Sequence, residues 1–260
     1  MKKLLFLLLI GYSTLAFGQQ ADMPDFDMEE FDKKSEIAEW LFEYDMVAWV
    51  TTDSVMASDK KEIEKLGAEW FCYIEDYSWH AVYGDFENNN YEVVFHYLVE
   101  DYGEVERTDE SIDTSILNRY SRALQTAKKQ FSASIDTLKV GYNQYILENE
   151  DNTLSVYILP AFQTNNVAVY GKEFIYTIDE TGKNILKDDS YSQNQYRGFE
   201  IDETKEIWLD YSELEKPTIG ALFFAWYYKS YFAKIIISTS KSTTTTMKVE
   251  DGWTWVNAVK

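Results

Sequence analysis

The chain has 260 residues, of which 45 are acidic and 24 basic, so its formal net charge is −21 at pH 7. Such an acidic surface repels nucleic acid and anionic membrane faces, which bind through dense Lys and Arg, and we exclude nucleic acid as a partner. Hydrophobic residues make up 45% of the chain, enough for a large core, while the single cysteine, Cys72, forbids an internal disulfide.

Residues 1–18 have the pattern of a secretory signal peptide. Lys2 and Lys3 precede an apolar run at 4–10, and the small residues Ala16 and Gly18 allow cleavage before Gln19. The apolar run is shorter than the roughly 20 residues of a membrane span, so we expect cleavage rather than anchoring. After cleavage 22 basic residues remain against 45 acidic ones, a net charge of −23. We therefore expect an exported periplasmic or extracellular protein, without a membrane span or a lipid anchor.

The mature chain is predicted to form a single α+β domain at 34–260 after a short acidic tail. Residues 19–33 are acidic and poor in aliphatic side chains, which predicts a solvated segment. Apolar side chains then recur at helical spacing from Ser35 onward, at Ile37, Leu41, Tyr44 and Ala48. This spacing predicts an N-terminal helix with one buried face.

Residues 68–100 alternate between apolar and polar side chains around an Asn-rich segment, which predicts a β-hairpin. The two histidines of the chain, His80 and His96, lie in its two strands. A hairpin symmetric about Asn88 would place them directly opposite each other on one face, where both rings could reach a metal. A one-residue slip would separate them. We therefore expect no metal site and keep this pair as a conditional one, with ordinary strand histidines as the main interpretation.

Residues 113–135 are predicted to form a long central helix, with Asp113 as its N-cap. Its outer face carries a basic cluster, Arg119, Arg122, Lys128 and Lys129. The cluster would suit an anion, but a solvated face paired with neighbouring carboxylates is the preferred interpretation.

The second half of the chain is predicted to be a largely antiparallel sheet with one further helix. Strands are expected at 142–148, 153–159, 173–178, 184–187, 234–240, 243–249 and 253–259. Residues 217–232 are apolar nearly all round, which predicts a buried helix opened by Pro217, with a buried strand pair as the rival. The Ser/Thr run at 238–246 is better explained by a strand than by a glycosylated stalk.

Aromatic residues are the best candidates for a binding surface. Tyr and Trp combine an apolar body with a polar tip, which suits contacts with sugar rings or with a protein partner. The predicted binding residues are Trp226, Tyr227, Tyr228, Trp253 and Trp255. The rival interpretation is that these side chains form the core and the sheet faces.

Two function classes follow. The first is a non-catalytic exported protein that binds a partner protein or a glycan through aromatic surface. The second is a carboxylate-dependent hydrolase acting on cell-envelope or glycan substrates, although its carboxylates cannot be chosen among 45 acidic residues. There is no serine-hydrolase elbow, phosphate loop or dinucleotide fingerprint, so we predict no catalytic residue and no cofactor.

Two resemblances accompany these patterns. The segments Tyr157-Ile158-Leu159-Pro160-Ala161 and 176–183 resemble uncharacterised secreted families of Bacteroidota. The order strand, Pro-Thr, helix and Ile-rich strand over 207–249 is similar to the core of JAB/MPN metalloproteases. Both histidines of their zinc motif are missing here, so the resemblance implies a metal-free derivative without catalytic residues.

Overall fold

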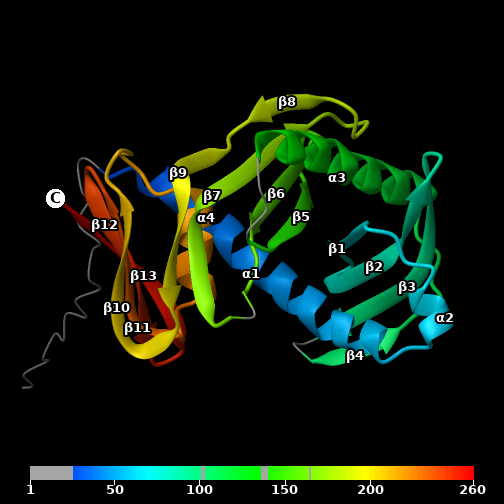
Figure 1. Cartoon of the computed structure of the whole chain (residues 1–260), viewed down its shortest axis with the longest axis horizontal. Coiled ribbons are helices and arrows are strands. Elements are labelled where there is room, and N and C mark those ends of the chain that lie inside the picture. The colour runs from blue at the N-terminus through cyan, green and yellow to red at the C-terminus, as the bar shows by residue number, and fades with distance from the viewer. Residues whose placement is uncertain (1–25, 101–102, 136–139, 164) are drawn as a thin grey trace, which may run out of the picture.

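The computed structural model describes residues 26–100, 103–135, 140–163 and 165–260, and it confirms the α+β class. The predicted signal peptide and the first residues of the predicted acidic tail lie outside the described residues. The described chain forms layers, with α3 (Thr114–Ser134) on one side of two neighbouring sheets and α1 (Met28–Met56) on the other (Figure 1). No helix in the described part of the chain is long and apolar enough to cross a membrane.

The first sheet contains the predicted hairpin and has the order β1-β2-β3-β4, all antiparallel. Its strands are β1 (Trp70–Glu75), β2 (Ser78–Glu87), β3 (Asn90–Glu100) and β4 (Glu104–Arg107), and the short α2 (Lys60–Ile63) precedes them. Asn88 and Asn89 both have positive φ, as a two-residue turn requires when its twist matches the flanking strands. The hairpin prediction is therefore confirmed.

The second sheet has the order β5-β6-β7-β8, and β9 also pairs with the long strand β7. The strands are β5 (Tyr142–Glu148), β6 (Leu154–Pro160), β7 (Val167–Ile178), β8 (Ile185–Asp188) and β9 (Tyr191–Glu200). Gly182, in the predicted turn between β7 and β8, has φ 75° and supplies the expected left-handed residue. The sequence patterns did not predict β9.

Two hydrophobic cores lie on the two faces of these sheets. Alternate residues of β1 show the division: Phe71 and Tyr73 join the core under α3, while Cys72 between them joins the core shared with α1. Both faces are buried because each is covered by a helix.

The helix α3 spans the predicted range, and Asp113 accepts a hydrogen bond from the backbone N–H of Ser115 at 2.8 Å, so the predicted N-cap is confirmed.

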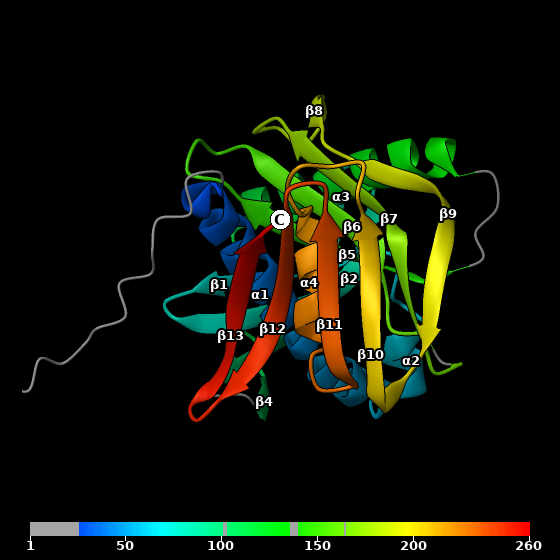
Figure 2. The same cartoon turned by 90° about the vertical axis from the view of Figure 1, so that its left-hand side faces the viewer.

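The third sheet has the order β10-β11-β12-β13 and contains the one parallel pair among the described strands, β10 with β11. Its strands are β10 (Asp202–Tyr211), β11 (Phe232–Thr239), β12 (Ser242–Val249) and β13 (Gly252–Val259). A parallel pair needs a crossover, which here is α4 (Ile219–Tyr227). Figure 2 shows this sheet in front of α4, with its outer face uncovered by any helix.

The buried helix predicted at 217–232 exists but is shorter than expected. The Thr218 hydroxyl accepts a hydrogen bond from the backbone N–H of Ala221 at 3.1 Å, which makes Thr218 the N-cap and leaves Pro217 outside the helix. The helix ends at Tyr227, because the chain turns into β11 within a few residues. The Ser/Thr run covers the end of β11, a turn and most of β12, so the preferred strand interpretation is confirmed, and Thr244 and Thr246 are buried.

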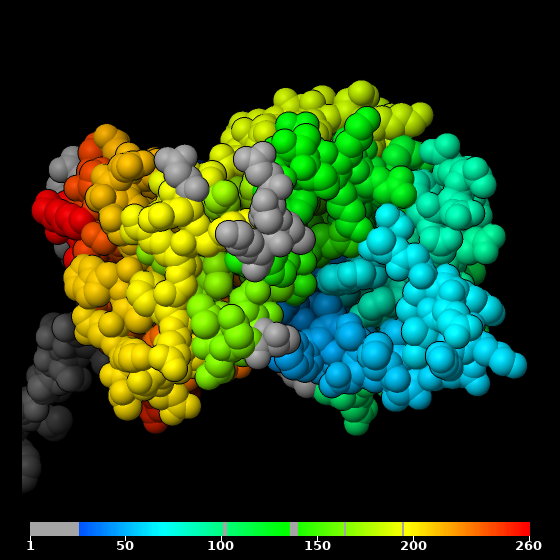
Figure 3. Space-filling view, in the orientation of Figure 1, coloured from blue at the N-terminus to red at the C-terminus, as the bar shows by residue number. Residues whose placement is uncertain are grey.

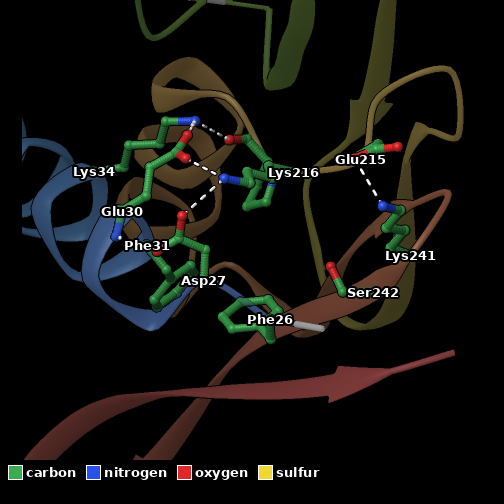
Figure 4. Close-up of a pocket in the computed structure, with 10 residues that line it drawn as sticks. Phe26, Asp27, Glu30, Phe31, Lys34, Glu215, Lys216, Lys241 and Ser242 are labelled. Atoms are coloured by element: carbon green, nitrogen blue, oxygen red, sulfur yellow. Dashed lines mark hydrogen bonds and ion pairs between the residues drawn. The ribbon is translucent and has the colours of Figure 1, made fainter. Parts of the chain in front are cut away.

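The predicted start of the N-terminal helix is wrong by seven residues, since α1 begins at Met28 rather than Ser35. The N-cap Asp27 and the carboxylate of Glu30 both bind the ammonium of Lys216, which precedes α4 (Figure 4). Phe31 is 5% exposed and packs edge-on against Trp255. The solvated tail therefore does not reach Lys33. The local N-cap and two i,i+4 Glu–Lys ion pairs favour this first turn, and the contacts with Lys216 and Trp255 add tertiary support.

Candidate functional site

A cavity of about 300 Å³ lies beside the middle of α1, and we call it the Asp45 pocket. It is lined by Asp45, Ala48, Trp49, Thr52 and Asp53 of α1, Trp70 of β1, Asn143 of β5, and Ala161 and Phe162 after β6. The α1 residues share one helix face because they recur at steps of three and four. In Figure 3 this part of α1 (blue) meets the green segment after β6 at the molecular surface.

The carboxylate of Asp45 is held by three donors from two other elements, β5 and α4. Its Oδ1 accepts a hydrogen bond from the Tyr145 hydroxyl at 2.8 Å and another from the Asn143 amide at 2.7 Å. The Tyr227 hydroxyl, at the end of α4, also hydrogen-bonds to this carboxylate. The residue is only 4% exposed, yet it lines the cavity. Its position is therefore fixed by β5 and α4 rather than by α1 alone.

Burial dominates the electrostatics of this carboxylate. Loss of hydration raises the pKa of Asp45, and the donors Tyr145, Asn143 and Tyr227 oppose the rise by stabilising the ionised form. None of the nine lining residues is basic. The pocket therefore offers hydrogen-bond acceptors and negative charge, and it provides no cationic side chain to compensate a bound anion.

Aromatic rings form the apolar walls of the pocket. Trp49 is 55% exposed and meets Phe162 edge-on, with 6.4 Å between the ring centroids. On its other side the Phe162 ring packs against Tyr228 and Tyr231, each with 6.0 Å between the ring centroids. Packing thus holds Phe162 in place, while much of the Trp49 ring stays accessible to a ligand.

The five aromatic residues predicted to bind lie in two separate places. Tyr227 and Tyr228 are buried and support the Asp45 pocket from behind. Trp226, Trp253 and Trp255 are half-buried at the third sheet, where Trp226 stacks on Trp255 with centroids 5.3 Å apart. The structure therefore brings the two tyrosines to a cavity and leaves the three tryptophans outside it.

The two histidines share one face of the hairpin, but not in the predicted directly opposite arrangement. His80 pairs with Leu98 and His96 with Val82, so the two rings are diagonal neighbours. His80 Nδ1 lies 2.9 Å from His96 Nε2, and both residues are buried. Burial lowers the pKa of each imidazole. No group of three or more His, Cys, Asp or Glu that could hold a metal occurs among the described residues, so the pair supports no metal proposal.

The basic cluster on α3 pairs with carboxylates only in part: Arg119 does so closely and Lys128 at 3.8 Å, Arg122 binds a backbone carbonyl, and Lys129 is exposed. Arg119 pairs with Glu148, Arg122 donates to the carbonyl of Thr181 at 2.6 Å, and Lys128 donates to the carbonyl of Ala68 at 2.8 Å.

Cys72 is fully buried, and burial raises its pKa well above the ordinary thiol value. A reactive thiol would instead need an exposed, electropositive environment.

A larger cavity, about 400 Å³, lies on another face of α1, between that helix and the first sheet. Its one charged lining residue is Glu43. The other lining side chains are apolar or aromatic: Phe42, Met46, Val47, Val50, Tyr77, Trp79 and Val99. Ligand sites combine apolar walls with a few convergent polar groups. The Asp45 pocket has both features, so it is the better candidate.

Comparison of the chain with protein-family models, with curated proteins and with solved structures finds no match. The two family resemblances therefore stay predictions, and the site rests on its own geometry. Asp45 was not among the predicted site residues, although it stands four residues after Leu41 and three before Ala48 on the apolar face of α1. A charged residue in an apolar helical stripe was the available signal, because such a residue is buried only when it is paired.

Proposed function

We propose that this chain is an exported, non-catalytic protein that binds a neutral glycan in the Asp45 pocket. The observation that carries the proposal is the combination of an accessible Trp49 ring with a fixed Asp45 carboxylate in one cavity that has no basic lining residue. The leader-like residues 1–18 support export. The volume of about 300 Å³ suits one or two sugar units, at the small end of ligand sites.

The pocket chemistry matches a polyhydroxylated ring. The apolar face of a sugar stacks on an indole or phenyl ring, as Trp49 and Phe162 offer here. Its hydroxyl groups donate hydrogen bonds, and Asp45, Asp53 and Asn143 supply acceptor oxygens. Anionic ligands are disfavoured by these carboxylates and by the net charge of −21.

A carboxylate-dependent hydrolase is the second candidate, because the pocket holds two carboxylates and burial raises the pKa of Asp45, as a general acid requires. Two features favour binding instead. Asp45 and Asp53 both come from α1, eight residues and therefore about 12 Å of helix axis apart, and they line one wall. Hydrolysis needs carboxyl groups on either side of the scissile bond. The Tyr145 and Asn143 donors on Oδ1 of Asp45 also favour its ionised form, whereas a general acid must hold a proton.

The first experiment measures binding of neutral mono- and oligosaccharides, including glucose, mannose, galactose, xylose and N-acetylglucosamine oligomers, by calorimetry. We expect Trp49→Ala to weaken binding of the best ligand by about 30-fold, the effect of losing an aromatic anchor. Trp208→Ala is the matched control, since Trp208 is 52% exposed on β10, outside the pocket. It should leave the affinity unchanged.

Three outcomes separate the alternatives. Equal effects of Trp49→Ala and Trp208→Ala would contradict the Asp45 pocket as the site. Failure of every glycan to bind the folded chain would overturn the proposed function. Release of new reducing ends, lost in Asp45→Asn, would favour the hydrolase over the binding protein.

A further inference from the structure

The last strand, β13, ends the third sheet and pairs with β12 alone among the described strands. Figure 2 shows it in red at the free margin of the sheet. An edge strand presents unpaired backbone N–H and C=O groups, and folded proteins usually protect such an edge with charged side chains, bulges or a covering segment.

Unlike the other edge strands, β13 carries no charged side chain in its eight residues. Each of the other strands that end a sheet in the described chain has at least one: Glu75 in β1, Glu104, Glu106 and Arg107 in β4, Glu148 in β5, Lys187 and Asp188 in β8, Arg197 and Glu200 in β9, and Asp202, Glu203, Lys205, Glu206 and Asp210 in β10. An uncharged edge in a chain of net charge −21 is the exception.

The opposite edge of the same sheet is protected by a neighbouring strand. Gln193 of β9 donates to the backbone carbonyl of Asp210 in β10 at 2.7 Å, and Arg197 pairs with the Asp210 carboxylate. In contrast, the contacts of β13 within the described residues come from β12 and from its inner face. There Trp255 stacks on Trp226 and donates its indole N–H to Glu39 at 2.9 Å. The edge strand is therefore fixed in place, and no other described strand pairs with its outer backbone groups.

We propose that β13 pairs antiparallel with β13 of a second copy of this chain, which joins the two third sheets into one. A strand can always pair with itself about a two-fold axis, and such isologous contacts are the commonest route to dimers. Two chains of net charge −21 repel each other, so they associate best where neither carries charge, and β13 is that place.

Charge complementarity selects one register for this pair. When Trp255 lies on the two-fold axis, Thr254 faces Val256 of the second copy. The paired segment 252–259 contains no charged residue in either copy. Just beyond the strand, Glu250 of each copy then stands opposite Lys260 of the other. In the single chain Lys260 donates to the Ser238 hydroxyl of β11 at 2.8 Å, so its side chain turns from β11 toward the edge when the pair forms. Opposite charges across paired strands are stabilising.

Sedimentation equilibrium of the purified full chain between about 1 and 100 µM tests the dimer. We expect a mass of two chains at the upper end of this range. Val256→Lys should weaken association by at least about tenfold, because a lysine on the edge opposes strand pairing. Val256 is 38% exposed, so the fold should tolerate the change. Leu186→Lys, at a residue 60% exposed on edge strand β8, adds the same charge and should leave the dimer intact.

Cysteine cross-linking tests the register independently of whether Val256→Lys folds. With Cys72→Ala as background, Thr254→Cys with Val256→Cys should form a covalent dimer on mild oxidation, since facing residues of paired strands are within disulfide reach. Leu186→Cys with Asp188→Cys, equally spaced on β8, should not. A chain monomeric at about 100 µM would overturn the proposal, and so would a dimer that ignores Val256→Lys and forms no cross-link through β13.

Discussion

Two buried carboxylates meet α4 at its two ends, and they differ in what surrounds them. Glu173 of β7 lies at the start of the helix, where it accepts the backbone N–H of Gly220 at 2.5 Å and a hydrogen bond from the Thr218 side chain. Asp45 lies at the other end, where Tyr227 donates to it. Both are 4% exposed, but only Asp45 opens onto a cavity bordered by an accessible aromatic ring.

The difference separates a structural carboxylate from a candidate functional one. Glu173 is held by backbone at a helix N-terminus, which offsets part of the cost of burying this carboxylate. Asp45 is held by side chains from β5 and α4 that also shape a pocket. Changes at Glu173 should therefore alter stability first, while changes at Asp45 should alter ligand binding beside a smaller effect on stability.

The largest expected effect is the pH dependence of stability in Glu173→Gln. Burial raises the pKa of Glu173 from the ordinary value of 4.5 to about 7. As pH rises from 4.5 to 7, the unfolded chain loses this proton while the folded chain keeps it, so the wild type loses stability across the window. Relative to the wild type, Glu173→Gln should gain about 3 kcal/mol between pH 4 and pH 8, measured by urea unfolding.

The matched control for this carboxylate is Glu148→Gln, for which the expected change of stability with pH has the opposite sign. Arg119 hydrogen-bonds to Glu148 and lowers its pKa, so the wild-type pair contributes stability above pH 4.5 and loses it on acidification. A pH-independent difference between Glu173→Gln and the wild type would contradict the buried state of Glu173.

A smaller loss is expected when Gly220 gains a side chain. A β-carbon there would overlap the carboxylate of Glu173, so Gly220→Ala must push the pair apart. We expect a destabilisation of about 2 kcal/mol in thermal or urea unfolding, as for other overpacked sites. Gly103→Ala is the control, because a β-carbon at Gly103 meets nothing within 4 Å. Equal stability of the two variants would contradict the close contact between Gly220 and Glu173, on which the structural role of Glu173 depends.

The smallest of these effects concerns the support of Asp45. Tyr145→Phe removes one donor to its carboxylate and should cost about 1.5 kcal/mol, the value of a hydrogen bond to a charged group. The pKa of Asp45 should then rise further, which carboxyl NMR titration measures. Tyr142→Phe serves as control, since the Tyr142 hydroxyl donates to another hydroxyl, that of Tyr196, at 3.0 Å. An unchanged pKa of Asp45 would show that Tyr145 does not tune this group.

Much of the fold could be predicted because local patterns act over short stretches of chain. The central helix with its Asp113 cap, the hairpin and most later strands follow from hydrophobic periodicity and turn residues. The beginning of α1 was missed although local signals mark it: Asp27 caps the backbone N–H of Glu30, and Glu29–Lys33 is an i,i+4 ion pair in the first turns. The Asp45 pocket, in contrast, could not be predicted from local patterns, since it joins α1, β1, β5 and the segment after β6.

The histidine pair shows how tertiary structure decides what a local pattern leaves open. The turn at Asn88 and Asn89 would by itself put His80 and His96 on opposite faces. The register shifts after Tyr83, which pairs with Phe95 while Gly84 pairs with Val93, so Val94 is an extra residue. This bulge returns His96 to the face of His80. Gly84 permits it, because a β-carbon there would overlap the carbonyl of Glu92.

By itself the sequence determined the α+β class, the acidic surface, the exclusion of an internal disulfide and the order of most elements, because composition and periodicity act locally. Only the tertiary structure decided which of 45 acidic residues is buried beside a cavity, which aromatic rings stay accessible and which strand edge is left uncharged. These properties depend on contacts between distant segments. Burial and pairing, rather than residue type, set the chemistry of a carboxylate or an edge strand.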